Sequence, residues 1–131
     1  DALATEADFF AIGTNDLVQY LPAADRNNEY PGDLYSPLHP ALLRLLHDVL
    51  RTGARHGKPV AVCGEMAGDP GFTPLLLALG LGEFSLHPGT LLEVRRAIRG
   101  VGLADLRAQA RSLLRAGDRG GIERWMRANT P

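Results

Sequence analysis

Three short segments that read as strands, each closed by a glycine or by polar residues, constrain the fold of this chain most strongly. They occupy residues 9–12, 59–63 and 83–86, and segments with helical patterns separate them. Runs of this length are typical of strands buried in a parallel sheet. Strands that alternate with helices form parallel sheets with right-handed connections. The sequence therefore predicts an α/β fold with about three βα units.

The segments between the strands indicate several helices. Pro40 begins the strongest one, which Gly57 ends, and its apolar residues recur on one helical face: Leu42, Leu45, Leu46, Val49 and Leu50. Further helices are predicted from Thr73 to Gly80, from a Thr90 cap to Gly100, and over residues 103–115 and 122–127. Between Asn15 and Pro40, prolines, glycines and polar residues predict a long irregular connection with a short helix near residues 17–21.

Successive right-handed βα units place their strands side by side, so the three strands should be parallel neighbours in chain order. Their carboxyl ends, with Asn15, Asp16 and Cys63, should then meet at one rim. A complete (β/α)8 barrel needs about 250 residues, and 131 residues supply only part of one. We therefore expect Phe9, Ile12 and Val60 to be partly exposed, or covered by another copy.

Composition excludes several classes of function. With 14 basic and 15 acidic residues, the net charge is -1, which provides no basic field for nucleic acid or for an anionic membrane. The longest apolar run, residues 75–79, is far shorter than the roughly 20 residues of a membrane-spanning helix. The single cysteine, Cys63, cannot form an internal disulfide, which fits a reducing compartment. A cytoplasmic location is expected.

Polar residues that could support chemistry follow the first two predicted strands. Gly13 precedes Asn15, which offers an amide donor, and Asp16, whose carboxylate suits Mg2+. Cys63 ends the second strand. Each residue alone has a simpler interpretation: Asn15 and Asp16 as a helix-capping turn, Cys63 as a small buried apolar residue, and Arg26 as a solvated loop arginine. The four histidines lack metal-ligand spacing, and we assign them no role.

Five segments together resemble one family. They are residues 9–17 (FFAIGTNDL), 25–28 (DRNN), 34–37 (LYSP), 62–69 (VCGEMAGD) and 80–85 (GLGEFS). In order and spacing they are similar to enzyme I of the bacterial phosphoenolpyruvate:sugar phosphotransferase system, over about residues 1–99. Pyruvate phosphate dikinase and phosphoenolpyruvate synthase share the Asn-Asp and Cys-Gly elements and remain the alternative. Residues 84–88 (FSLHP) depart from the Ser-Met-Ser of many members, so the enzyme I module of a fused multiphosphoryl transfer protein also stays open.

The resemblance implies that residues 1–131 are part of a phosphoenolpyruvate-binding (β/α)8 barrel, with 101–131 as a helical tail. It implies that Asp16 ligates Mg2+, that Asn15 holds the phosphate, that Arg26 clamps the substrate, and that Cys63 protonates the enolate carbon to give pyruvate. The phosphoryl group would pass to a histidine on a separate N-terminal domain and then to the carrier protein HPr. Family members also form homodimers through this domain.

We also expect the chain to begin within a domain, because it opens at Asp1 in what reads as the end of a helix. The family's phosphoacceptor histidine, two further substrate arginines and a metal-binding glutamate would then lie upstream. The isolated chain should accordingly bind phosphoenolpyruvate weakly and not turn over. The contrasting hypothesis is a non-catalytic module that self-associates through its open sheet edges.

Overall fold

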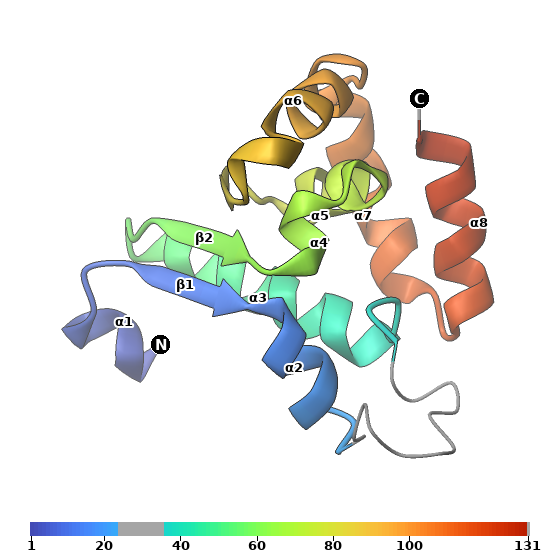
Figure 1. Ribbon diagram of the computed structural model, residues 1–131. Coiled ribbons are helices and arrows are strands. Elements are labelled where there is room, and N and C mark those ends of the chain that lie inside the picture. The colour runs from blue at the N-terminus through green and yellow to red at the C-terminus, as the bar shows by residue number, and fades with distance from the viewer. Residues whose placement is uncertain (24–35, 131) are drawn as a thin grey trace.

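A computed structural model describes residues 1–23 and 36–130, and Figure 1 shows a small parallel sheet among helices. The strands are β1 (Phe10–Gly13), β2 (Val60–Cys63) and β3 (Glu83–Ser85). The helices are α1 (Ala2–Glu6), α2 (Thr14–Tyr20), α3 (Pro40–Arg55), α4 (Glu65–Gly68), α5 (Thr73–Leu79), α6 (Leu91–Arg99), α7 (Leu103–Arg115) and α8 (Arg119–Asn129). Two short 3-10 turns, η1 (Pro70–Phe72) and η2 (Pro88–Thr90), precede α5 and α6.

The sheet has the predicted topology. Its strands lie in the order β1-β2-β3, and both pairings are parallel. Cys63 at the end of β2 is in register with Gly13 of β1 and with Ser85 of β3. The carboxyl ends of all three strands therefore share one edge, as expected. The described residues form a mixed α/β structure that is mostly helical, and a closed barrel is not seen among them.

One face of the sheet packs onto α3, which lies behind β1 and β2 in Figure 1. As predicted, Phe9 is 67% exposed and Ile12 is only partly buried. The same prediction was wrong for Val60, which is buried. A Cβ added at Gly53 of α3 would overlap Cγ2 of Val60, so the helix backbone approaches β2 closely and covers this side chain.

The two C-terminal helices belong to the same hydrophobic core as the sheet. Leu106 and Leu113 of α7, with Ile122 and Trp125 of α8, are buried in one cluster with Val62 and the apolar residues of α5. Figure 1 shows α7 and α8 beside each other at the side of the molecule away from α1. The C-terminal segment is therefore packed onto the α/β part rather than extended from it.

Some helix boundaries differ from the predicted ones. Helix α8 begins at Arg119 instead of residue 122. The Asp118 side chain accepts a hydrogen bond from the Gly121 amide at 2.7 Å, and this N-cap allows the helix to include Gly120 and Gly121. Thr90 does not cap α6 with its side chain. Its hydroxyl donates to the His87 carbonyl at 3.1 Å within η2. Helix α4, one turn long, was not predicted.

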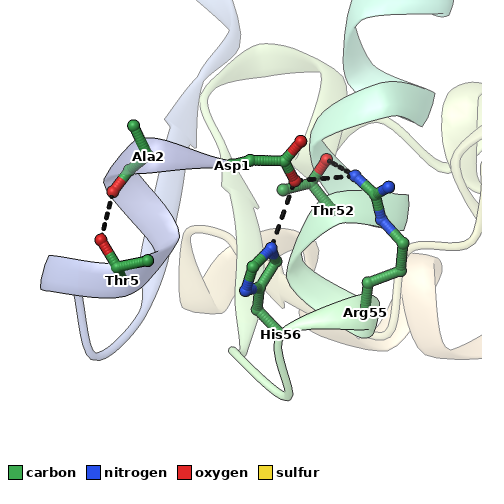
Figure 2. Close-up of polar contacts among 6 residues, drawn as sticks. All are labelled: Asp1, Ala2, Thr5, Thr52, Arg55 and His56. Carbon is green, nitrogen blue, oxygen red and sulfur yellow. Dashed lines mark hydrogen bonds and ion pairs between the residues drawn. The ribbon is translucent and has the colours of Figure 1, made fainter.

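Polar contacts at the N-terminus join α1 to the end of α3 (Figure 2). The Asp1 carboxylate lies 2.8 Å from Nη2 of Arg55 and 3.2 Å from Nε2 of His56. Arg55 also donates to the Thr52 hydroxyl at 3.1 Å. The Arg55 and Asp1 side chains are more than half exposed, and exposed ion pairs add little to stability. This cluster therefore orients α1 without anchoring it strongly.

Two side chains of α3 bind the C-terminal ends of neighbouring helices. His47 is partly buried, and its Nδ1 is 3.1 Å from the Leu79 carbonyl at the end of α5. Arg44 donates from Nε to the Leu114 carbonyl and from Nη2 to the Ala116 carbonyl, both at 3.3 Å. Arg44 is a cationic donor, and such donors at a helix C-terminus satisfy carbonyls that lack helical partners.

We expect Arg44→Ala to lower the free energy of unfolding by about 1 kcal/mol, because two hydrogen bonds to the α7 C-terminus are lost from an exposed site. Urea denaturation of the chain measures the change. Arg51→Ala, at an exposed position of the same helix, is the control and should change stability by less than about 0.5 kcal/mol. Equal losses in the two variants would contradict this role of Arg44.

Within the described residues, none of the helices has the length and apolar character needed to cross a membrane.

Candidate active site

Two hydrogen bonds fasten the loop after β1 to the loop after β2. The Thr14 hydroxyl donates to the Cys63 carbonyl at 2.8 Å, and the Glu65 amide donates to Oδ1 of Asn15 at 2.9 Å. Thr14 is completely buried, so its hydroxyl needs this partner. Asn15 and the segment Cys63-Gly64-Glu65 are thereby held together at the carboxyl edge of the sheet, which is the edge where α/β proteins place active sites.

Gly64 allows this close approach. Its backbone has φ +96° and ψ -167°, a region that is essentially restricted to glycine. A Cβ at this position would lie 2.7 Å from Oδ1 of Asn15 and 2.7 Å from Oγ1 of Thr14. Because Oδ1 of Asn15 accepts from the Glu65 amide, the Nδ2 group is the part of the Asn15 side chain that remains to donate to a ligand.

Asp16 is exposed in the first turn of α2, where the helix dipole favours a negative charge. Its Oδ2 lies 4.0 Å from the position of a Cβ added at Gly13, so the carboxylate is turned back toward the end of β1. No group of three histidine, cysteine or acidic residues that could hold a metal is found in the described part of the chain. Mg2+ is commonly bound by one or two carboxylates together with water and substrate phosphates, so an exposed Asp16 fits a single protein ligand.

Cys63 is partly buried on β2, and its Sγ donates to the Ile12 carbonyl of β1 at 3.4 Å. Val60 and Val62 face the core, and the alternation of a strand places Ala61 and Cys63 on the other face of the sheet. In Figure 1, the described helices leave the region in front of β1 and β2 uncovered. The thiol is therefore at the carboxyl edge of the sheet and on the face that α3 does not cover.

Two pockets adjoin Asn15. The inner pocket, about 160 Å3, is lined by Thr14, Asn15, Val18, Pro37, Glu65, Met66, Asp69 and Phe72. The outer pocket, about 510 Å3, is lined by Asn15, Gly64, Glu65, Gly68, Asp69, His87 and Thr90. Asn15, Glu65 and Asp69 line both, whereas Cys63 and Asp16 line neither. Of the predicted residues Asn15, Asp16 and Cys63, Asn15 is therefore the one that lines both pockets at this edge.

The structure also gives roles to residues for which the sequence suggested none. Thr14 fastens two loops, Gly64 makes room for it, and His87 brings the third strand end to the outer pocket. The polar character of Gly13 to Asp16 could have signalled Thr14, but no spacing rule points to His87. Arg26, predicted to bind substrate, lies outside the described residues.

Comparison with known proteins identifies the family of the chain. Residues 1–103 match the family described as "PEP-utilising enzyme, PEP-binding domain", where PEP is phosphoenolpyruvate. The chain belongs to this family. The matched range contains the three strands, both strand-end loops and all the residues that line the two pockets. Helices α7 and α8 lie almost entirely after it.

Curated relatives in the PEP-binding domain family carry the name phosphoenolpyruvate-protein phosphotransferase. The protein of Priestia megaterium is 48% identical over 114 residues, covering 87% of this chain and 20% of the relative. That of Geobacillus stearothermophilus is 54% identical over 99 residues, or 76% of this chain and 17% of the relative. That of Cupriavidus necator is 56% identical over 91 residues, or 70% and 16%. The chain thus spans about a fifth or less of these relatives.

Proposed function

We propose that this chain forms part of the PEP site of a phosphoenolpyruvate-protein phosphotransferase. In the proposed reaction, the phosphoryl group of PEP passes to a histidine on another domain and then to HPr, and pyruvate is released. The fastening of Asn15 to the Cys63-Gly64-Glu65 segment carries this proposal, because it places an amide donor and a thiol at one edge of the sheet. Relatives with 48–56% identity are named phosphoenolpyruvate-protein phosphotransferase, which supports a protein as the acceptor of the phosphoryl group.

The residues would divide the chemistry as follows. Nδ2 of Asn15 would donate to a phosphoryl oxygen, and Asp16 would bind Mg2+, which neutralises charge on the transferring phosphoryl group when bound. Arg26 would clamp the substrate. As the bond between phosphorus and the bridging oxygen breaks, the phosphoryl group leaves for histidine and an enolate remains. The Cys63 thiol would give its proton to the enolate methylene carbon, forming pyruvate, and the thiolate would regain a proton from solvent.

We also propose the larger assembly in which this site works. Residues 1–131 would form part of a (β/α)8 barrel, with 101–131 as its helical tail, and strands from the rest of the protein would pair with the outer edges of β1 and β3. Those edges carry backbone groups that a further strand can pair with, and Phe9 beside β1 is exposed. A homodimer in the cytoplasm is the proposed state.

A phosphoryl-transfer assay tests the proposed function. The full-length protein that carries this sequence is given PEP and Mg2+, with HPr in one reaction and AMP with both phosphate and pyrophosphate in another. Pyruvate is then measured by a coupled reaction. We expect pyruvate and phosphorylated HPr only in the first reaction. Product in the nucleotide reaction alone would support pyruvate phosphate dikinase or PEP synthase, and no pyruvate in either would refute the proposal.

Asp16→Ala should remove the Mg2+-dependent activity of the full-length protein, because Asp16 is the carboxylate proposed to bind the metal directly at the end of β1. The assay titrates Mg2+ with the wild type and the variant. Asp8→Ala, which changes an exposed acidic residue before β1, is the control and should retain the wild-type magnesium dependence. An unchanged magnesium curve in Asp16→Ala would show that Asp16 is not the ligand.

A further inference from the structure

His87 lies just after the third strand and is not used by the function proposed above. It caps the 3-10 turn η2: its Nδ1 accepts a hydrogen bond from the Gly89 amide at 3.1 Å. A backbone amide can only donate, so Nδ1 must be the acceptor and the ring proton of the neutral imidazole is on Nε2. Nε2 is consequently a donor on an exposed side chain, where it is accessible to a ligand.

The outer pocket contains a second donor in a similar state. Asn15 lines this pocket together with His87, and its Oδ1 is occupied by the Glu65 amide. The Asn15 side chain therefore also has only N–H groups left for a ligand. Two side chains from different strand ends, each with its acceptor atom engaged by backbone, thus offer donors to one pocket of about 510 Å3. Such a pair is complementary to anionic oxygens.

The carboxylates of the outer pocket narrow the class of ligand. Glu65 and Asp69 also line it, and one Asp69 oxygen is occupied by the Gly71 amide at 2.8 Å. Two carboxylates disfavour a bare anion by charge repulsion. A phosphate ester that arrives with a divalent cation carries compensating positive charge and still presents anionic oxygens. The pocket therefore suits a metal-complexed phosphate ester better than free phosphate.

We infer that His87 is a substrate-positioning residue, whose Nε2–H donates to an anionic oxygen of metal-complexed PEP in the outer pocket. This inference rests on the proposed function, since it assigns one more contact to the same substrate. His87 brings the end of β3 into a site otherwise built from the ends of β1 and β2. The contact would hold PEP equally in the bound substrate complex and in the transition state, so its loss should raise KM for PEP and leave kcat largely unchanged.

Two substitutions test the roles of the two ring nitrogens of His87 independently. In His87→Asn, the amide oxygen can replace Nδ1 as the acceptor for Gly89, but the side chain is too short to replace Nε2. In His87→Gln, the amide nitrogen can replace the Nε2 donor, while the cap of η2 is lost. We expect His87→Asn to raise KM for PEP about tenfold, the effect of losing one hydrogen bond to a charged group. His87→Gln should keep KM within about threefold.

The full-length protein is tested with PEP, Mg2+ and HPr, and its melting temperature is measured in parallel. His39 provides a matched control, because its Nδ1 caps α3 by accepting from the Ala41 amide at 3.2 Å, but it lines a different pocket. His39→Asn should leave KM unchanged. The inference is overturned if His87→Asn retains the wild-type KM, or if only His87→Gln is impaired with a lowered melting temperature. A wild type that produces no pyruvate would instead refute the proposed function, and this inference with it.

Discussion

Replacing Cys63 by alanine in the full-length protein is expected to reduce pyruvate release by about 10²- to 10⁴-fold, the usual contribution of a positioned proton donor. The thiol is at the end of β2, on the face of the sheet that α3 does not cover. Its Sγ contacts the Ile12 carbonyl, and the Asn15 side chain is held by Glu65, so neither group depends on the other for its position. The affinity for PEP should therefore change by only a few-fold.

Rapid-quench measurement of pyruvate, together with a PEP binding titration, separates these two effects. Cys63→Ser is a companion variant of similar size, whose hydroxyl is a weaker acid than the thiol and should also be slow. The control is Ala61→Ser, on the same face of β2 but two residues earlier, where little change is expected. Wild-type pyruvate release by Cys63→Ala would exclude the thiol as the proton donor.

The sheet was predictable because its signal is local. The strands around Phe10 and Val62 are short apolar runs, and parallel order follows from the right-handed connection alone. The prediction that failed, the partial exposure of Val60, depended on contacts with residues that are distant in the sequence. Val60 is buried because Gly53, a residue of another element, lets α3 approach. The burial of Val60 was therefore decided by a tertiary contact.

The candidate site was likewise predictable only where the signal is local in the sequence. Asn15, Asp16 and Cys63 were found because reactive residue types follow predicted strands and because five segments resemble a known family. Their roles remain predictions. Thr14 and His87 were missed, since a threonine that binds a carbonyl 49 residues away and a histidine that caps a 3-10 turn have no sequence signature. Such long-range and capping contacts appear only when the chain is folded.

Gly64→Ala is expected to lower stability by about 3 kcal/mol, since the strained backbone and the crowding of a new Cβ each cost about 1–3 kcal/mol. The added Cβ would lie 2.7 Å from both Oδ1 of Asn15 and Oγ1 of Thr14. Neither atom can move away freely, because each is engaged in a hydrogen bond that joins the two loops. Displacement of Asn15 should also reduce kcat/KM for PEP by about 10²-fold, the effect of a small misplacement at a reacting centre.

Gly80→Ala separates crowding from backbone strain. Gly80 also has a positive φ, +107°, but nothing lies within 4 Å of an added Cβ, and it ends α5 away from the two loops. This control should lose about 1 kcal/mol of stability and retain kcat/KM. Urea denaturation of the chain and turnover of the full-length protein measure the two effects. If Gly64→Ala behaves like Gly80→Ala in both, the close approach of the two loops does not position Asn15, and the site must be built in another way.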